Sequence, residues 1–363
     1  MRPWREEEDA VDEGSTADAV RESGIDLDPV PPGGRRVPGD GHEHGLEHGH
    51  GHDPAHAEGA GSHDHPHPHR RSEPGEAPLV GIIGAGAVGT ALGVALSRAG
   101  WPVAAVATRD RDRRDRFGSL VPGARRFAEA SALLDEVELV LVCVPDDAIA
   151  DVAASIRLYS GQAIVHTSGL LGADVLSPAL AAGTQAGSFH PLVAFAETER
   201  AVAALHGATV AIEGDDQLAG LLAEMAEAVG ATPVRLAPGT KPAYHAAAVL
   251  AAGGFVALLD AIAELGRVAG LDEAGSLAIY GPLIEQTLAN ARSLGIRAAL
   301  TGPVTRGDRG TLEAHLAALH AHAPDVLALY RAAAEREIEL AEARGVLTTT
   351  DAVSLRALLA TPV

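Results

Sequence analysis

The sequence has almost no cysteine and few aromatic residues, which make up 3% of the chain. Its one cysteine, Cys143, has no partner for an intrachain disulfide, and this scarcity is typical of a reducing compartment. Cys143 lies within the apolar run 139–144, where we expect it to fill the core rather than to act as a nucleophile. The composition therefore favours a cytoplasmic protein that is held together by packing.

Positive charge and long apolar runs are also scarce. Lysine and arginine number 28 against 49 aspartate and glutamate, and the formal net charge of −21 argues against nonspecific nucleic-acid binding. The longest apolar run, residues 246–259, is shorter than the ~20 residues that span a bilayer, so we expect a buried core helix and no membrane segment. The first residues lack the apolar region of a secretory signal.

Residues 1–76 contain few large apolar side chains and many acidic, proline and glycine residues. Such a segment cannot bury enough surface to offset the entropy lost on ordering, so we expect a disordered extension. Ten histidines lie between His42 and His69. Their spacing is not that of a structural metal site, and we expect no catalytic metal. The tract is either a solvated linker or a loose nickel or zinc binder.

The run LVGIIGAGAVG has the pattern of a buried strand that ends in G-x-G-x-x-G and continues as a helix. Gly84 permits the tight turn, Gly86 lets backbone N–H groups approach a pyrophosphate, and Gly89 lets the helix pack closely on the strand. The phosphates would lie at the helix N-terminus beside Ala87 and Val88. The motif predicts a dinucleotide-binding site.

The second predicted strand, residues 102–107, is followed by Thr108 and Arg109 rather than by an acidic residue. A hydroxyl and a guanidinium suit a 2′-phosphate, which favours NADP over NAD. Alternatively, the alternating arginines and aspartates of residues 109–115 form only a solvated surface.

Polar residues also follow the next strands of the predicted sheet. The cofactor should be lined by three residues at the end of the strand 139–144, namely Val144, Pro145 and Asp146. Two further strands end in the segments HTSG, which contains His166 and Ser168, and SFHP, which contains His190. Ligands bind at the carboxyl ends of strands in open α/β sheets, although both histidines can instead be structural. The strands 209–212 and 233–236 complete the sheet.

From residue 238 onward the pattern is helical. Pro242 suits a first helical position, so Lys241 should cap this helix and His245 should lie in its first turn. Four later helices are predicted, over residues 256–268, 272–294, 311–321 and 324–343. The loop between them carries Thr301 and Arg306 and is too elaborate for a simple connector. An internal pair of Arg306 with Asp308 is the alternative to a binding role.

Several motifs together resemble a known family. They are LVGIIGAGAVGTAL, VCVPDDAI, IVHTSG, GSFHPL, YHAAAV and ALTGPVTRGDRGT followed by His315 and Leu316. The combination, over residues 78–335, resembles the Rossmann-like family whose C-terminal part is domain of unknown function 2520. That family is similar in architecture to pyrroline-5-carboxylate reductase, ketopantoate reductase and deazaflavin-dependent NADP oxidoreductases. Where the family often has asparagine after YHAAAV, this chain has Gly253 and Gly254.

The sequence thus predicts an α/β protein with an N-terminal Rossmann NADP-binding domain over residues 77–237 and an all-helical substrate and dimerisation domain over 238–363. The resemblance implies an NADPH-dependent reductase of a small anionic 2-oxo acid, with 2-dehydropantoate as the best substrate hypothesis. Proton donation would fall to His245 or Lys241, with Arg306 on the substrate carboxylate. Further substrate contacts would come from Ser168, His190 and Thr301. The alternatives are an imine or pyrroline reductase, and a non-enzymatic NADP-binding or metal-handling protein. A homodimer is expected.

Overall fold

The computed structural model describes residues 76–237 and 239–361. It contains two compact units, one that ends at Ala248 and one that begins at Val249, and each is described by itself. The predicted domain boundary at residue 238 lies before the first helix of the helical region, whereas most of that helix belongs to the first unit. Residues 1–75 of the predicted extension, with the histidine tract, lie outside the described residues.

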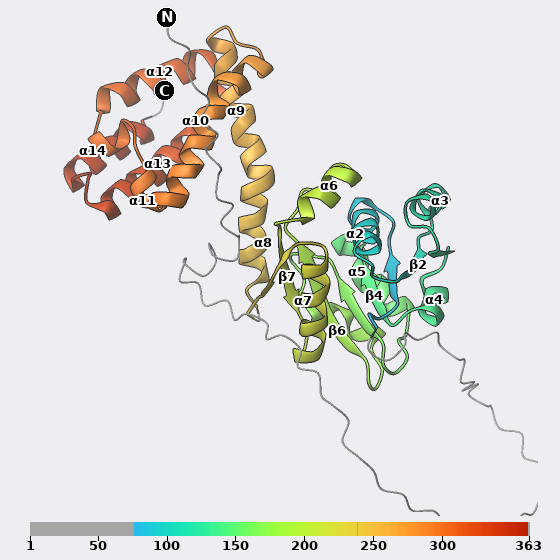
Figure 1. Ribbon diagram of the computed structural model, residues 1–363. Coiled ribbons are helices and arrows are strands. Elements are labelled where there is room, and N and C mark those ends of the chain that lie inside the picture. The colour runs from blue at the N-terminus through green and yellow to red at the C-terminus, as the bar shows by residue number, and fades with distance from the viewer. Residues whose placement is uncertain (1–75, 238, 362–363) are drawn as a thin grey trace, which may run out of the picture. The chain divides into compact units, whose positions relative to one another are not determined.

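The first unit is built around an eight-stranded sheet with the order β3-β2-β1-β4-β5-β6-β7-β8. Neighbouring strands are parallel except β6 and β7, which are antiparallel. The order of the first six strands is that of a dinucleotide-binding sheet, and the predicted α/β fold is confirmed (Figure 1). The strands are β1 (Val80–Ile83), β2 (Val103–Ala107), β3 (Arg125–Phe127), β4 (Leu139–Val142), β5 (Ala163–His166), β6 (Gln185–Pro191), β7 (Thr209–Glu213) and β8 (Thr232–Arg235).

Both faces of this sheet are covered, because successive side chains of a strand point to opposite faces. Val80 and Ile82 of β1 pack into one core, and Ile83 packs into the other. The first core also receives apolar residues from α2 (Ala87–Arg98), α3 (Arg111–Leu120), α6 (Thr198–Leu205) and α7 (Asp216–Ala228). The second receives them from α4 (Ala130–Leu133), η1 (Leu134–Glu136), α5 (Asp146–Ser155) and η2 (Ala173–Ala179). Cys143 is buried in the first core as predicted, and burial raises the pKa of its thiol to about 12.

The sequence did not predict β3, α3, α4, α6, the short α11 (Ile296–Ala299) or the last helix, α14 (Thr349–Ala360). Strand β3 has only three residues and two of them are exposed arginines, so it carries no apolar pattern. It is an edge strand, and its arginines form ion pairs with Glu136 and Asp115. Charged edge positions of this kind discourage pairing with another sheet.

The second unit is helical, as predicted. Its core lies between α12 (Arg309–His322), α13 (Leu327–Arg344) and α14, where Leu312, Ile338 and Leu355 are buried. Helix α8 (Lys241–Val249) continues into a short π-helix, η3 (Leu250–Gly254), which contains Gly253 and Gly254. The other elements are α9 (Phe255–Val268), α10 (Glu273–Leu294), α11 (Ile296–Ala299), η4 (Val304–Arg306), α12 (Arg309–His322), η5 (Pro324–Val326) and α13 (Leu327–Arg344).

The apolar run 246–259 is helical, but the prediction that it is a buried core helix is wrong for the single chain. Val249 is 52% exposed and Leu250 is 71% exposed. The continuous helix Lys241–Val268 is long and apolar enough to cross a membrane by length and composition, and an 18-residue stretch of it has a mean hydropathy of 2.1 and is 11% buried. The described residues of the chain supply no layer over most of this helix.

Candidate functional site

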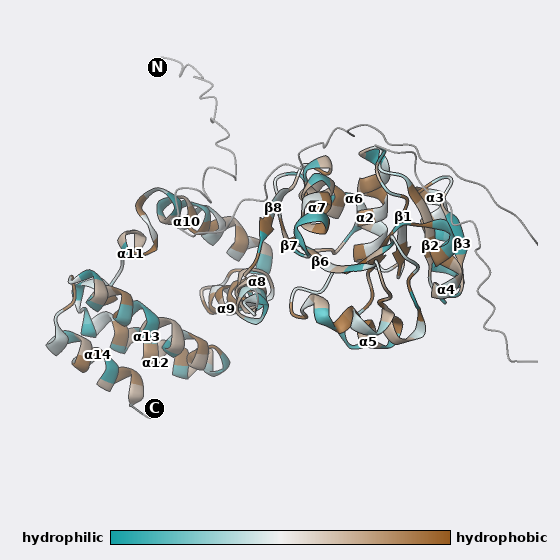
Figure 2. Cartoon of the chain, turned by 90° about the horizontal axis from the view of Figure 1, so that it is seen from below, coloured by the Kyte–Doolittle hydropathy of each residue, from teal (hydrophilic) through white to brown (hydrophobic). Residues whose placement is uncertain are grey.

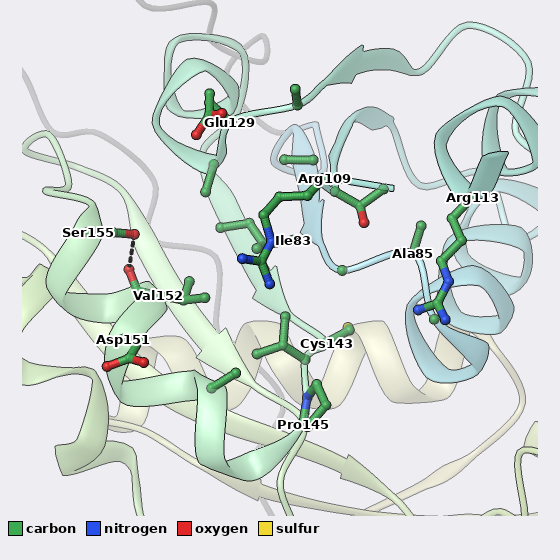
Figure 3. Close-up of a pocket in the computed structure, with 18 of the residues that line it drawn as sticks. Ile83, Ala85, Arg109, Arg113, Glu129, Cys143, Pro145, Asp151, Val152 and Ser155 are labelled. Atoms are coloured by element: carbon green, nitrogen blue, oxygen red, sulfur yellow. Dashed lines mark hydrogen bonds between the residues drawn. The ribbon is translucent and has the colours of Figure 1, made fainter. Parts of the chain in front are cut away.

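A cavity of about 750 Å³ opens at the glycine-rich turn between β1 and α2. Figure 3 shows Ile83 at the end of β1, Arg109 after β2, Cys143 after β4 and Val152 of α5 (Asp146–Ser155) around it. All but two of the predicted cofactor residues line this cavity: Gly84, Gly86, Ala87, Val88, Thr108, Arg109, Val144 and Pro145. The remaining two are Gly89, which is buried within α2, and Asp146, which begins α5.

Glycine suits each of the three motif positions for a different structural reason. Gly84 has a φ of 101°, and a Cβ there would lie 2.4 Å from the Cys143 carbonyl oxygen. A Cβ on Gly89 would lie 2.0 Å from the Gly84 carbonyl oxygen, so only glycine lets α2 pack on the strand. Gly86 has nothing within 4 Å of its Cβ position and is the N-cap of α2, so its backbone faces open space. This open N-terminus of a helix fits a pyrophosphate.

Arginines from the end of β2 and from α3 border the same cavity. Arg109 extends into it in Figure 3, and Arg113 lies on the side of the glycine-rich turn. Arg114 instead donates hydrogen bonds to the Thr108 and Arg109 carbonyl oxygens and so holds the loop. Arg111 pairs with Asp115 at 3.7 Å on the exposed side of α3. Of this arginine run, Arg109 and Arg113 line the cavity, where guanidinium groups would suit a 2′-phosphate; the binding role stays a prediction.

A second group of polar residues gathers at the carboxyl ends of β5 and β6. His166 is fully buried, and its Nδ1 accepts the Ser168 backbone N–H at 3.2 Å. Its Nε2 therefore carries the proton that is donated to the Gly172 carbonyl oxygen at 3.1 Å. Burial, followed by the charge of Lys241, lowers the pKa of His166 to about 4. His166 is thus a neutral residue that positions the HTSG turn.

Ser168 is also committed to internal hydrogen bonds. Its hydroxyl donates to Asp146 Oδ2 at 2.8 Å and accepts the backbone N–H groups of Leu170 and Leu171. The side chain is buried, and its one proton is used by Asp146. Ser168 and Asp146 therefore tie the end of β5 to the start of α5, directly beside Pro145 in the cavity wall.

Lys241 lies at the first residue of α8 and is 2% exposed. Its ammonium forms an ion pair with Glu213 Oε2 at 3.2 Å, and among the described residues Nζ has no other hydrogen-bond partner. The same Glu213 oxygen accepts a hydrogen bond from Ser188 Oγ at 2.9 Å. Burial lowers the pKa of Lys241, and the charge of Glu213 partly opposes this effect. A buried ammonium with unused donors is costly without a ligand.

His190, Tyr244 and His245 form the open side of this group. The Tyr244 hydroxyl lies 3.3 Å from His190 Nδ1, and the rings of His190 and His245 meet edge to face with centroids 5.8 Å apart. Burial, followed by the charge of His245, lowers the pKa of His190 to about 4, and burial raises that of Tyr244 to about 12. Gly169 makes the contact possible, because a Cβ there would lie 2.5 Å from His245 and 2.7 Å from His190.

The first unit thus brings together four of the predicted catalytic or substrate residues: Ser168, His190, Lys241 and His245. The sequence analysis did not identify Glu213, Gly169 and Tyr244 as members of the group. Glu213 is the last residue of β7, and that strand end was the signal that would have found it. The other two are recognised only from tertiary contacts.

Thr301 and Arg306 belong to the second unit, where both are exposed. Their loop is ordered by local contacts: Gly307 is left-handed with a φ of 64°, and Asp308 caps α12 by accepting the Thr311 N–H and hydroxyl. These bonds to Thr311 lower the pKa of Asp308, with a smaller contribution from the charge of Arg306. The guanidinium of Arg306 thus lies at the surface of this unit.

Comparison with known proteins agrees with the two-part fold. Residues 68–191 match the family model of the Rossmann-like domain, and residues 208–337 match that of the Domain of unknown function (DUF2520). A search of curated proteins finds no match.

Among solved structures, a provisionally named NADP oxidoreductase from Bacteroides fragilis has a TM-score of 0.60 and 24% identity over 72% of this chain and 98% of its own. A 1-pyrroline-5-carboxylate reductase from Streptococcus pyogenes has a TM-score of 0.52 and 16% identity over 73% and 98%. A reductive aminase from Aspergillus terreus, in complex with NADPH4, cyclohexanone and allyl amine, has a TM-score of 0.51 and 20% identity. The match covers 78% of this chain and 92% of the aminase chain. These likenesses concern the fold. The chain therefore carries a Rossmann-like domain followed by the domain of unknown function DUF2520.

Proposed function

We propose that the protein is an NADPH-dependent oxidoreductase that reduces the carbonyl group of a small 2-oxo acid, with 2-dehydropantoate as the best candidate. The observation that carries this proposal is the buried ammonium of Lys241, which is ion-paired with Glu213 and has no further hydrogen-bond partner among the described residues, in the same unit as a cavity suited to a dinucleotide. The two are linked through residues 145 and 146. Pro145 lines the cavity, and the charge of Asp146 acts on both Lys241 and His190.

The cavity residues have distinct parts in holding the cofactor. The N-terminus of α2 at Gly86 would receive the pyrophosphate, and Thr108, Arg109 and Arg113 would receive the 2′-phosphate. NADPH supplies the hydride when it is bound. The remaining requirement is a group that donates a proton and stabilises the negative charge that develops on the substrate oxygen.

Lys241 meets that requirement best among the residues of this group. Apart from the ion pair with Glu213, its N–H donors have no hydrogen-bond partner within the described chain, and its lowered pKa makes proton release easier than from an exposed lysine. Glu213, at 3.2 Å, keeps the side chain in place and favours its charged form. His245 and His190 would then contact the substrate. A carboxylate-binding role for Arg306 stays a prediction from the sequence.

Reduction of a C=N bond is the second candidate. The structures named above include a 1-pyrroline-5-carboxylate reductase and a reductive aminase, whose names describe C=N chemistry on the same fold. In that case the substrate nitrogen would already carry a proton, and Lys241 would act mainly on binding. The role of Lys241 therefore separates the two candidates.

The test is oxidation of NADPH, followed by absorbance, with a panel of 2-oxo acids, matched neutral ketones and cyclic imines. The proposal expects turnover of 2-oxo acids, strong preference for NADPH over NADH, and loss of turnover in Lys241→Met. Turnover of imines alone would support the second candidate. Tight NADPH binding without turnover of any of these substrates would contradict both.

A further inference from the structure

Lys241 is the only lysine among the 28 lysine and arginine residues of the chain. Its side chain is 3% exposed, and its Nζ atom is covered by the chain's own atoms. If Lys241 gives its proton to the substrate, as proposed above, the neutral amine must regain a proton before the next turnover. Water does not reach a covered atom directly, and the chain has no second lysine to replace it. A neighbouring side chain must therefore return the proton.

Three polar side chains form a row across neighbouring strands. The strand register pairs His166 of β5 with Ser188 of β6, and Ser188 with Glu213 of β7. Residues opposite each other point to the same face of a sheet, and Figure 2 shows β6 beside β7. Ser188 is 1% exposed, and its hydroxyl donates to Glu213 Oε2 at 2.9 Å. The register therefore holds the Glu213 carboxylate in place against Lys241.

Glu213 is the member of this row that contacts both Lys241 and solvent. Its Oε2 lies 3.2 Å from Lys241 Nζ, and its side chain is 17% exposed, against 3% for Lys241. His166 is fully buried, and both of its ring nitrogens are engaged with backbone groups. Ser188 is also buried. The Glu213 carboxylate is thus the group of the row through which a proton from water can reach Lys241.

A second carboxylate, that of Asp146, also acts on Lys241 but is placed differently. Burial lowers the pKa of Lys241, and the charges of Glu213 and Asp146 oppose this effect. Of the two carboxylates, Glu213 forms the ion pair with Lys241, whereas Asp146 accepts the Ser168 hydroxyl at 2.8 Å. A proton passes between groups that are within hydrogen-bond reach. Asp146 therefore adjusts the charge of the site, while Glu213 can exchange protons with Lys241.

We propose that Glu213 is a proton relay between water and Lys241, and that Ser188 positions it. The relay rests on the proposed reduction of a carbonyl group. As the hydride adds to the carbonyl carbon, an N–H bond of Lys241 breaks and its proton goes to the substrate oxygen. Glu213 then takes a proton from water and passes it to the neutral amine. This transfer is downhill, because a protonated carboxyl is a far stronger acid than an ammonium. Each turnover thus takes one proton from solvent, and both side chains regain their starting charges.

Stopped-flow oxidation of NADPH by the full chain with Glu213→Gln, and with a 2-oxo acid that the wild-type chain reduces, tests the relay. Glutamine keeps an oxygen that can accept from Ser188, but it cannot take up and release a proton. The first turnover uses the proton already on Lys241 after incubation in a mildly acidic buffer. We expect a first turnover at close to the wild-type rate, followed by turnovers that are slower by about 10²-fold. Equal slowing of the first and later turnovers would make Glu213 a structural partner of Lys241 only, and would overturn the proposal.

Asp216→Asn is the matched control for the loss of a carboxylate. Asp216 begins α7, close to Glu213 in the chain, and its side chain is 95% exposed and pairs with Arg235 at 2.8 Å. This variant should follow the wild-type time course in both phases. Glu213→Asp keeps a carboxyl group and should restore part of the rate of the later turnovers. A Glu213→Asp variant as slow as Glu213→Gln would contradict the relay.

Ser188→Ala keeps the test decisive if Glu213→Gln does not fold. It removes one hydrogen bond from the Glu213 carboxylate and should slow only the later turnovers, by about 3- to 10-fold. Equal slowing of both phases, or no slowing, would contradict the positioning of the relay by Ser188. A wild-type chain that turns over no 2-oxo acid contradicts the proposed function, and the relay with it. Normal wild-type turnover, with no difference between the two phases in either variant, contradicts the relay alone.

Discussion

The two sites of the first unit are built in different ways. The dinucleotide cavity is open and depends on glycines, backbone groups and exposed arginines that are close together in the sequence. The group around Lys241 is buried, and its members come from β5, β6, β7 and α8. Backbone N–H groups can bind a phosphate at a site that is open to water. A buried ammonium, by contrast, is stable only while its neighbours compensate for the lost hydration. Substitutions should therefore have larger effects in the second site than in the first.

Lys241→Met should have the largest effect on catalysis. The variant has an unbranched side chain of similar length and lacks the proposed proton donor, so kcat should fall by about 10²- to 10⁴-fold with little change in NADPH affinity. Steady-state kinetics with a 2-oxo acid and fluorescence titration with NADPH measure the two quantities. His245→Ala is the comparison, and a larger loss of kcat in that variant would exchange the two roles.

The pH dependence of stability should reveal the buried histidine. The pKa of His166 is about 4 in the folded chain against 6.5 in the unfolded chain. Between these two pH values the histidine is protonated in the unfolded chain and neutral in the folded chain. The contribution of His166 to the free energy of unfolding is therefore complete above pH 6.5 and is lost as the pH is lowered toward 4. The shift corresponds to about 3 kcal/mol. Urea unfolding at several pH values should give a shallower dependence in His166→Gln, and equal slopes would contradict the assignment.

Gly169→Ala tests the contact between the strand end and the two histidines. Its Cβ would lie 2.5 Å from His245 and 2.7 Å from His190, so both rings must move. We expect kcat/KM to fall by about 10²-fold, because small misplacements of reacting groups are costly. Gly86→Ala is the control for space, since nothing lies within 4 Å of its Cβ. That variant should lose NADPH affinity while keeping the histidine contacts, and equal kinetic defects in the two variants would weaken the distinction between the sites.

The sequence predicted the local features of the molecule better than the tertiary ones. The glycine motif and seven of the eight strands follow from short-range patterns, since buried parallel strands are continuous apolar runs. Strand β3 was missed because its two arginines are exposed. The roles of Glu213 and Gly169 depend on contacts between distant segments, which no spacing encodes. Burial of the run 246–259 was predicted from its composition. The described part of the chain nevertheless leaves most of this helix exposed.

The arginines of the dinucleotide cavity should show the smallest effect and the clearest selectivity. Arg109→Ala should weaken NADPH binding by about 10- to 100-fold and leave NADH nearly unchanged, because only NADPH carries the 2′-phosphate. Arg111→Ala is the matched control, since Arg111 is an exposed arginine that pairs with Asp115 at 3.7 Å and does not line the cavity. Isothermal titration with each cofactor distinguishes the cases. Equal losses for NADPH and NADH in Arg109→Ala would place the 2′-phosphate elsewhere, and Arg113, which lines the same cavity from α3, would then be the next residue to change.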